Sequence, residues 1–341
     1  MAKEQVPFDQ AAFLNDFSGC LGLIDQAQLL GESLARDGVE RVLLVGCGAP
    51  HYMFRAINLW IGSIINASVV VDIYPAELIQ ARYIPDEKSV VIFGSHSGKT
   101  NETLQGAQAL KNNGSITVAI TERDDSPLAK SVKKVLAYGP SKQGYFSSVI
   151  LTLALVSAFL KNRSPDWDIH STLISSLHNF PTALADAKQA SMADGMRYAA
   201  SLQDEKSLFV IGNGPMYTTA YVFAACFLME MQRINAHPIK ALDFFHGPFE
   251  LLDASTPIIL LLGEGVFRPD AERVAKFCAR YTGGCIRYDA ASFAMQGIDP
   301  KIRPIAAPFI VDAALTNVVE QLAIMRGHAL DIRRYMGKVD Y

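Results

Sequence analysis

Three hydroxyl side chains surround a glycine in the segment SHSGKT, which directly follows an apolar run. Ser95, Ser97 and Thr100 can each donate a hydroxyl hydrogen, and Gly98 lets a ligand approach the backbone closely. A helix that starts here would also present free N–H groups with a partial positive charge. One hydroxyl would indicate a helix cap, but three within six residues favour a bound anion. Neutral donors of this kind suit a terminal phosphomonoester that is held without a metal ion.

The Gly-Lys-Thr ending of this segment is reminiscent of a nucleotide-binding loop, but the spacing differs. A P-loop has a glycine, four residues and then Gly-Lys-Ser/Thr. Counting back from Gly98 places Phe93 at the first glycine position, and Gly94 lies one residue too late. The sequence therefore disfavours a nucleotide-binding protein.

Glu230 is the first candidate for acid–base chemistry. It ends a largely apolar stretch, 215–229, that predicts a helix. A carboxylate that loses hydration among apolar neighbours becomes a stronger base, which suits proton transfer near neutral pH. The alternative is an exposed carboxylate at the helix end, paired with Arg233.

His246 is the second candidate and lies in the segment DFFHGPFELLD. A histidine among phenylalanines is most often a packed core residue. The Gly247-Pro248 turn interrupts regular structure here, so the ring can instead project into a cleft, and imidazole gives and takes protons near pH 7. Glu250 adds a carboxylate to the same turn, with a solvated or helix-capping acid as the alternative.

Strand-like and helix-like runs alternate in the first half of the chain. We expect strands at 42–45, 68–73, 89–93, 116–120 and 132–137, with helices at 51–65 and 101–112 among them. This alternation predicts a parallel sheet that is covered by helices on both faces. Ligands of such sheets bind beyond the carboxyl ends of the strands, where SHSGKT lies.

The pattern then repeats. ERVLLVGCGAP, from Glu40, aligns with KSLFVIGNGPM, from Lys206, and VVIFGSHSG resembles the later segment IILLLGEG. We therefore predict two domains, residues 1–165 with an N-terminal helix and the phosphate-binding loop 94–100, and residues 166–341 with a linker helix and a C-terminal tail. The second copy has Gly-Glu-Gly in place of the hydroxyls, so only the first half is expected to hold an anion.

Composition narrows the class of protein. Of the 341 residues 50% are hydrophobic and 19% are charged, the net charge is −3, and no basic tract indicates a nucleic-acid partner. Five cysteines without a C-x-x-C pair favour a reducing cytoplasm over a disulfide scaffold or a zinc site. The start MAKEQVPFDQ does not resemble a signal peptide. The uncharged segment 143–160 is interpreted as a helix in a core or subunit interface and not as a membrane span.

Taken together, these motifs resemble those of double sugar isomerase (SIS) domain proteins over nearly the whole chain. The family loop S-x-S-G-x-T is matched by residues 95–100, which include His96, and in the isomerase half of glucosamine-6-phosphate synthase it binds the sugar phosphate. The resemblance implies an α/β fold of two tandem SIS domains, each a flavodoxin-like or Rossmann-like three-layer unit. It also implies a homodimer or tetramer.

The same resemblance assigns roles to single residues. Glu230 matches the glutamate that ends the helix after the second glycine turn. His246 matches a histidine of an H-G-P motif that the neighbouring subunit supplies, and Lys338 matches a C-terminal lysine that enters the sugar site. Gly48 belongs to the first glycine turn, where the synthase continues with Thr-Ser. This chain has Ala-Pro instead, so that phosphate contact is missing or is replaced by His51 or His96.

The segments FLMEMQ, DFFHGPFE and RRYMGKVDY are similar to those of deglycases that cleave phosphorylated sugar–amino acid adducts. That likeness implies fructoselysine, glucoselysine or fructose-aspartate 6-phosphate as substrate, with Glu250 in the sugar site and no cofactor. The products would be a hexose 6-phosphate and a free amino acid. Phe227 stands where the synthase has a lysine one turn before its glutamate, so ring opening or the substrate pose is expected to differ.

Two other functions stay open at this point. One is a phosphosugar aldose–ketose isomerase or an amino-sugar-phosphate deaminase, and the other is a non-catalytic sugar-phosphate sensor. Glu230 and His246, and the lack of a basic face, weigh against the sensor. The stretch before Glu40 is too short for a glutamine-hydrolysing domain, so we expect no use of ammonia from glutamine.

Overall fold

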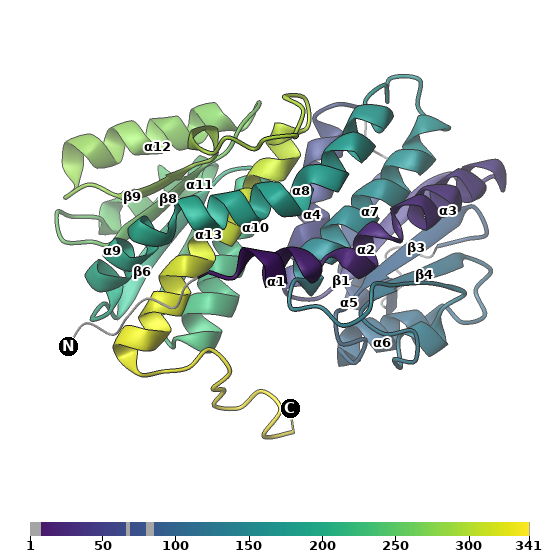
Figure 1. The fold of residues 1–341 in the computed structure, drawn as a ribbon, viewed down its shortest axis with the longest axis horizontal. Coiled ribbons are helices and arrows are strands. Elements are labelled where there is room, and N and C mark those ends of the chain that lie inside the picture. Colours follow the sequence, from purple (N-terminus) through teal and green to yellow (C-terminus); the bar gives the residue numbers. More distant parts are fainter. Residues whose placement is uncertain (1–7, 66–68, 80–84, 341) are drawn as a thin grey trace. The chain divides into compact units, whose positions relative to one another are not determined.

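The computed structural model describes residues 8–65, 69–79 and 85–340 (Figure 1). It contains two compact units. The N-terminal unit comprises Asp9–Pro181 with Gly297–Ile302, and the C-terminal unit comprises the described residues of Thr182–Gln296 and Arg303–Tyr341, together with Phe8. The units change at Pro181, within helix α8 (His170–Ala190). The domain boundary that we place at 165 stays a prediction.

The N-terminal unit is built on a fully parallel sheet in the order β2-β1-β3-β4-β5. Its strands are β1 (Arg41–Gly46), β2 (Val70–Ile73), β3 (Ser89–Gly94), β4 (Ile116–Thr121) and β5 (Lys134–Ala137). Its helices are α1 (Gln10–Asn15), α2 (Ser18–Leu21), α3 (Ile24–Arg36), α4 (Ala49–Gly62), α5 (Pro75–Ile79), α6 (Asn101–Ala109), η1 (Ala129–Ser131) and α7 (Gly144–Lys161). The predicted strands are confirmed within a few residues, although Ser68, the predicted start of the second, lies outside the described residues.

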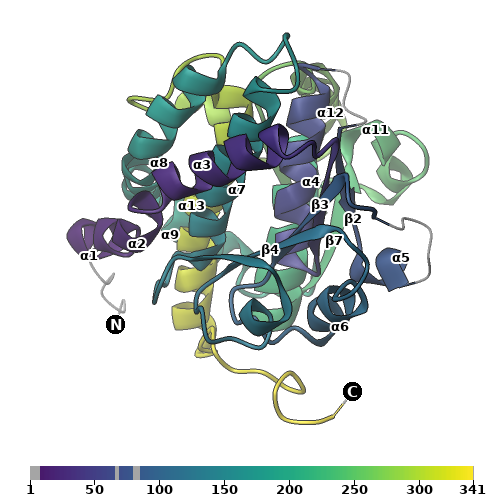
Figure 2. The same ribbon diagram turned by 90° about the vertical axis from the view of Figure 1, so that its right-hand side faces the viewer.

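Side chains alternate across this sheet, so each strand feeds two cores. Val45 and Phe93 belong to the cluster that includes Leu78 of α5 and Ala107 of α6. Helices α4 and α7 contact the sheet and one another, and α3 lies along α7 in both views (Figure 1 and Figure 2). The helices on both faces confirm the predicted layers.

Helix α7 is the uncharged segment that we interpret from the sequence as a helix in a core or a subunit interface. By length and composition alone, α7 and α13 (Arg303–Arg326) are the described helices that are long and apolar enough to cross a membrane. Of their most apolar windows, 89% and 72% are buried inside the protein, respectively. This burial fits the prediction that α7 is a core helix. Its packing against α3 is close, since a Cβ on Gly31 would lie 2.2 Å from the carbonyl oxygen of Leu155.

The C-terminal unit repeats the same design with the parallel order β7-β6-β8-β9. Its strands are β6 (Ser207–Gly212), β7 (Asn235–Lys240), β8 (Ile258–Leu262) and β9 (Ile286–Asp289). Its helical elements are α9 (Met192–Leu202), α10 (Pro215–Val222), the π-helix η2 (Phe223–Met231), α11 (Ala241–Phe244), the 3₁₀ turns η3 (Pro248–Leu251) and η4 (Ala290–Ser292), α12 (Arg268–Tyr281) and α13. Gly48 and Gly214 precede α4 and α10 with φ of 60° and 52°. The predicted duplication is confirmed.

Candidate active site

The hydroxyl-rich loop lies between β3 and α6, at the point where the strand order of the first sheet reverses. Strands β1 and β3 are neighbours, with Gly46 paired to Gly94, and their connections lead to α4 and α6 on opposite faces. Such a divergence opens a crevice at the carboxyl ends of the two strands. Gly48, which is exposed, and residues 95–100 therefore border one crevice.

The loop is held by hydrogen bonds among its own hydroxyls. Ser95 is buried, its Oγ lies 3.0 Å from Thr100 Oγ1, and it accepts a hydrogen bond from the Gly98 N–H at 3.2 Å. Ser97 is exposed and accepts from the Lys99 N–H at 3.2 Å. Ser95 therefore braces the loop, whereas Ser97 and the partly exposed Thr100 are the hydroxyls that a ligand can reach.

Gly98 is required by this loop for two reasons. Its φ is 61°, in the left-handed region that favours glycine. A Cβ at this position would also lie 2.4 Å from Ser126 Oγ. The chain reverses here so that Thr100 precedes α6 directly, and its side chain makes no capping hydrogen bond among the described residues.

His96 and His51 differ in whether they can replace the missing Thr-Ser contact. The His96 ring is 51% exposed, stacks on Tyr138, and has Nδ1 2.8 Å from Tyr138 Oη. His51 is buried, stacks on Tyr74 with ring centroids 3.7 Å apart, and burial lowers its pKa. His96 is thus the imidazole that the crevice can present to an anion.

Removal of Ser97 or Thr100 hydroxyls tests the anion site. We expect Ser97→Ala and Thr100→Val each to raise the Kd of a hexose 6-phosphate about 10- to 100-fold, because a hydrogen bond to a charged group contributes ~1.5–3 kcal/mol. Titration calorimetry measures this directly. Ser131→Ala, which removes an exposed hydroxyl bonded to the Pro127 carbonyl, is the matched control. Unchanged affinity in both variants would place the phosphate elsewhere.

Glu230 lies in the π-helix η2, whose backbone hydrogen bonds span five residues where those of an α-helix span four. The N–H of Gln232 bonds to the carbonyl of Phe227, five residues earlier. Such segments often occur at functional sites. The sequence pattern predicted only an ordinary helix here, because a π-helix has no distinct apolar periodicity over so short a span.

The surroundings of the Glu230 carboxylate differ from both alternatives that the sequence offered, an apolar environment and an exposed helix end. Its Oε1 accepts a hydrogen bond from Nε of Arg333 at 2.7 Å, and the side chain is 26% exposed. The carboxylate is therefore neither surrounded by apolar groups alone nor paired with Arg233. Arg333 lies 103 residues away in sequence, and the only signal for it was the RRYMGKVDY motif.

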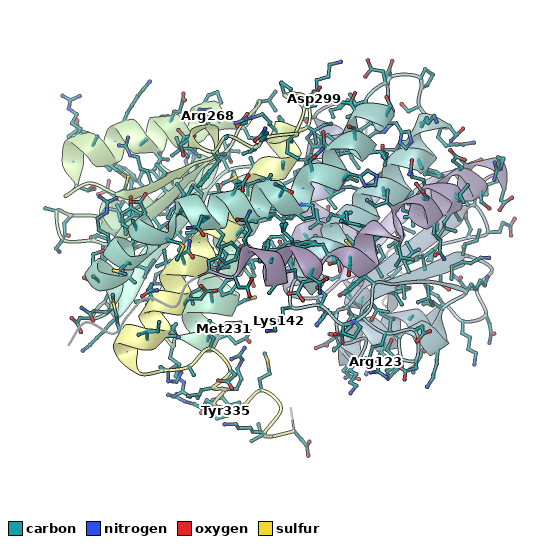
Figure 3. All side chains as sticks on the ribbon, viewed as in Figure 1. Arg123, Lys142, Met231, Arg268, Asp299 and Tyr335 are labelled. Carbon is teal, nitrogen blue, oxygen red and sulfur yellow. The ribbon has the colours of Figure 1, made fainter. Side chains whose placement is uncertain are left out.

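A cavity of ≈ 610 Å³ opens beside this carboxylate within the C-terminal unit. It is lined by Met229, Glu230, Arg233, Ile234, Asn235, Arg333, Arg334, Tyr335 and Met336. Met231 and Tyr335 lie at the same end of the unit, with Arg268 at the other (Figure 3). Lys338 follows in the same C-terminal segment and is exposed, with its N–H bonded to the Tyr335 carbonyl. The segment with the predicted lysine thus runs beside the predicted base.

His246 is exposed and is not a packed core residue. It lies between α11 and η3, and its N–H bonds to the Asp243 carbonyl. The neighbouring phenylalanines, not the imidazole, form the core contact, with Phe244, Phe245, Phe249 and Phe277 packed ring against ring. Glu250 is also exposed on this turn. The aromatic cluster therefore anchors a turn that presents both polar groups outward.

Within one chain the structure does not bring Glu230 and His246 together. Glu230 precedes β7, and Asn235, the first residue of that strand, lines the same cavity. His246 follows the other end of the strand. Six residues of β-strand span ~20 Å, so Glu230 and His246 lie beyond opposite ends of β7.

Comparison with known proteins identifies the chain. The SIS domain model matches residues 38–162. Fructosamine deglycase FrlB of Bacillus subtilis (strain 168) is 31% identical over 320 residues, which are 93% of this chain and 97% of the relative. The chain belongs to the SIS family. It is an enzyme of that family, as the motifs predict.

Two further relatives of this SIS enzyme are informative. The agropine synthesis conjugase of Rhizobium rhizogenes is 29% identical over 89% of this chain and 88% of that protein. A solved structure from Bacillus subtilis, provisionally named a phosphosugar isomerase, superposes with a TM-score of 0.85 at 29% identity, over 93% of this chain and all of that one. These matches extend across both units.

The glycine loop of the second SIS sheet is surrounded by different side chains from those of the first. The carboxylate of Glu264 pairs with Arg303 at 2.7 Å, and the Phe267 ring fills the space beside Gly214. That the first unit alone holds the anion stays a prediction. Among the described residues no cluster of three or more His, Cys, Asp and Glu is placed to bind a metal ion.

Proposed function

We propose that this enzyme is a deglycase that cleaves a 6-phosphorylated sugar–amino acid adduct to a hexose 6-phosphate and a free amino acid. The observation that carries the proposal is a carboxylate, Glu230, at a cavity large enough for the amine half of such an adduct. The 31% identity to a fructosamine deglycase over nearly its whole length supports the same reaction. The anion loop of the first unit supplies a place for the phosphate.

For a 1-amino-1-deoxyfructose 6-phosphate the steps follow from these groups. Ser97 and Thr100 hold the phosphate, braced by Ser95, and this fixes the sugar chain. Glu230 takes a proton from C1, which gives an enaminol, and returns a proton to C2. The product is an imine at C1, which water hydrolyses to glucose 6-phosphate and the amine. For an amine on C2 the same groups would move the proton from C2 to C1, and hydrolysis of the resulting C2 imine would release fructose 6-phosphate.

His246 is proposed to act in the site of a neighbouring copy, where it moves protons at the ring oxygen, the C2 oxygen or the amine. Its separation from Glu230 by the length of β7 supports this assignment. Leu242 and Leu251 flank the histidine turn and are 57% and 70% exposed, as expected for a surface that a second copy covers. The proposed assembly is a cytoplasmic homodimer or tetramer.

The same groups can catalyse the reverse condensation of a sugar phosphate with an amino acid. The 29% identity to a conjugase favours this as the second candidate function. Hydrolysis and condensation pass through the same imine, so the concentrations of water, amine and sugar decide the direction.

A product assay separates these functions. The enzyme is given phosphorylated fructosamines and glucosamine-type adducts, plain hexose 6-phosphates, and hexose 6-phosphates with amino acids. We expect release of hexose 6-phosphate and amino acid from at least one adduct. Interconversion of plain hexose phosphates with every adduct left intact would instead identify an isomerase. Net adduct formation at millimolar amino acid would identify the condensing direction.

A further inference from the structure

The cavity beside Glu230 holds more positive charge than that carboxylate neutralises. Arg233, Arg333 and Arg334 all line it, and only Arg333 is paired with Glu230. Neither of the other two has an ion-pair partner among the residues that the structure describes. Arg334 instead lies over the Tyr335 ring, 6.0 Å from its centroid. Two guanidinium groups are thus available to an anionic ligand.

The backbone at Arg233 adds an independent observation. Its φ is 55°, in the left-handed region, where the chain leaves η2 and the Ile234 N–H bonds to the Leu228 carbonyl. Glycine is the residue that favours this position after a helix, and other residues adopt it at an energetic cost. A strained residue that lines a cavity points to a use for its side chain.

The remaining walls of the cavity are apolar. Met229, Tyr335 and Met336 line it and are 39%, 62% and 49% exposed, and Asn235 adds an amide. A ligand that fits these walls has an apolar part next to an anionic group. A carboxylate suits arginine particularly well, because its two oxygens can accept two parallel hydrogen bonds from one planar guanidinium group. An amino acid has this combination, whereas a simple amine lacks the anion.

We propose that Arg233 and Arg334 bind the carboxylate of the amino acid half of the adduct. The cavity is then the subsite that selects carboxylate-bearing amines over amines without a carboxylate. This inference rests on the proposed deglycase function and names the residues that recognise the amino acid half of its substrate. Arg333 keeps its bond to Glu230.

The test compares two adducts that differ only in the carboxylate. These are the 1-deoxyfructose 6-phosphate adducts of alanine and of ethylamine. We expect the wild-type kcat/KM for the alanine adduct to be about 10- to 100-fold higher, the range for loss of hydrogen bonds to a charged group. Arg233→Gly, which keeps the left-handed backbone, and Arg334→Ala should each reduce this preference about tenfold or more.

Arg197→Ala is the control, since this exposed arginine pairs with Asp194 elsewhere in the C-terminal unit. It should keep the wild-type preference. Equal kcat/KM for the two adducts in the wild type, or equal losses for both adducts in the arginine variants, would overturn the subsite and leave the deglycase function standing. If the enzyme cleaves neither of these adducts and no other adduct in the panel, the subsite and the deglycase function are both wrong.

Discussion

Replacement of Glu230 by glutamine is expected to lower kcat about 10²- to 10⁴-fold, the usual contribution of a positioned general base or acid. The amide keeps the shape of the side chain but cannot take the C1 proton. The amide oxygen can still accept the Arg333 hydrogen bond, so the loss of charge in this mostly buried pair should cost about 1–3 kcal/mol of folding free energy. The variant should therefore fold and still bind a hexose 6-phosphate, which calorimetry and a turnover assay together measure. Full activity would remove Glu230 from the mechanism.

His246→Ala should show a loss of similar size, and mixing the two inactive variants should restore activity. Each copy of a mixed dimer contributes what the other lacks, because Glu230 and His246 lie at opposite ends of β7 in one chain. Random exchange makes about half of the dimers mixed, each with one intact site, so about a quarter of wild-type activity should return. If verified subunit exchange leaves the mixture inactive, the shared-site assignment is wrong.

Asp312→Asn is expected to stabilise the protein above pH 7, by about 2–4 kcal/mol in the free energy of unfolding. Asp312 lies in α13, is 3% exposed, and its Oδ1 has no hydrogen-bond partner in the described part of the chain. Burial raises the pKa of this carboxyl group from 3.8 to about 7, against the opposing effect of Lys188. Ionisation of Asp312 at neutral pH therefore costs free energy in the folded protein but not in the unfolded chain.

The sign follows from that raised pKa. The protonated form stabilises the fold fully below pH 3.8, and this contribution is lost as the pH rises through about 7. The wild-type and variant urea midpoints should therefore coincide near pH 4 and separate toward pH 8.5, with unchanged m-values. Asp204→Asn, at an exposed turn, is the control and should show no such divergence. Parallel curves for Asp312→Asn would contradict the buried-acid explanation.

Much of the fold was predictable because it depends on local patterns. Buried parallel strands are short apolar runs, and the turns after β1 and β6 need glycine at positive φ. Both copies of the repeat can therefore be recognised in the sequence. The hydroxyl-rich loop at 95–100 was visible in the sequence for the same reason. Its hydroxyls, glycine and helix start are consecutive, and the carboxyl end of a parallel strand determines where they lie.

The candidate site in the C-terminal unit was predictable only in part. The sequence singled out Glu230 and His246 as candidates for acid–base chemistry, but it could not indicate that β7 separates them. The Glu230–Arg333 bond joins segments 103 residues apart, and the cavity walls come from both. Such contacts depend on how the C-terminal segment packs against η2, and no periodicity within either segment encodes that.

The sequence by itself therefore determined the two parallel-sheet units, the position of the hydroxyl loop and the SIS family. Only the tertiary structure decided that His246 is exposed while its phenylalanine neighbours are packed, that Asp312 is buried without a hydrogen bond to Oδ1, and that arginines gather beside Glu230. The physical reason is range. Strand and turn formation depend on neighbours within a few residues, whereas burial and charge pairing depend on which distant segments pack together.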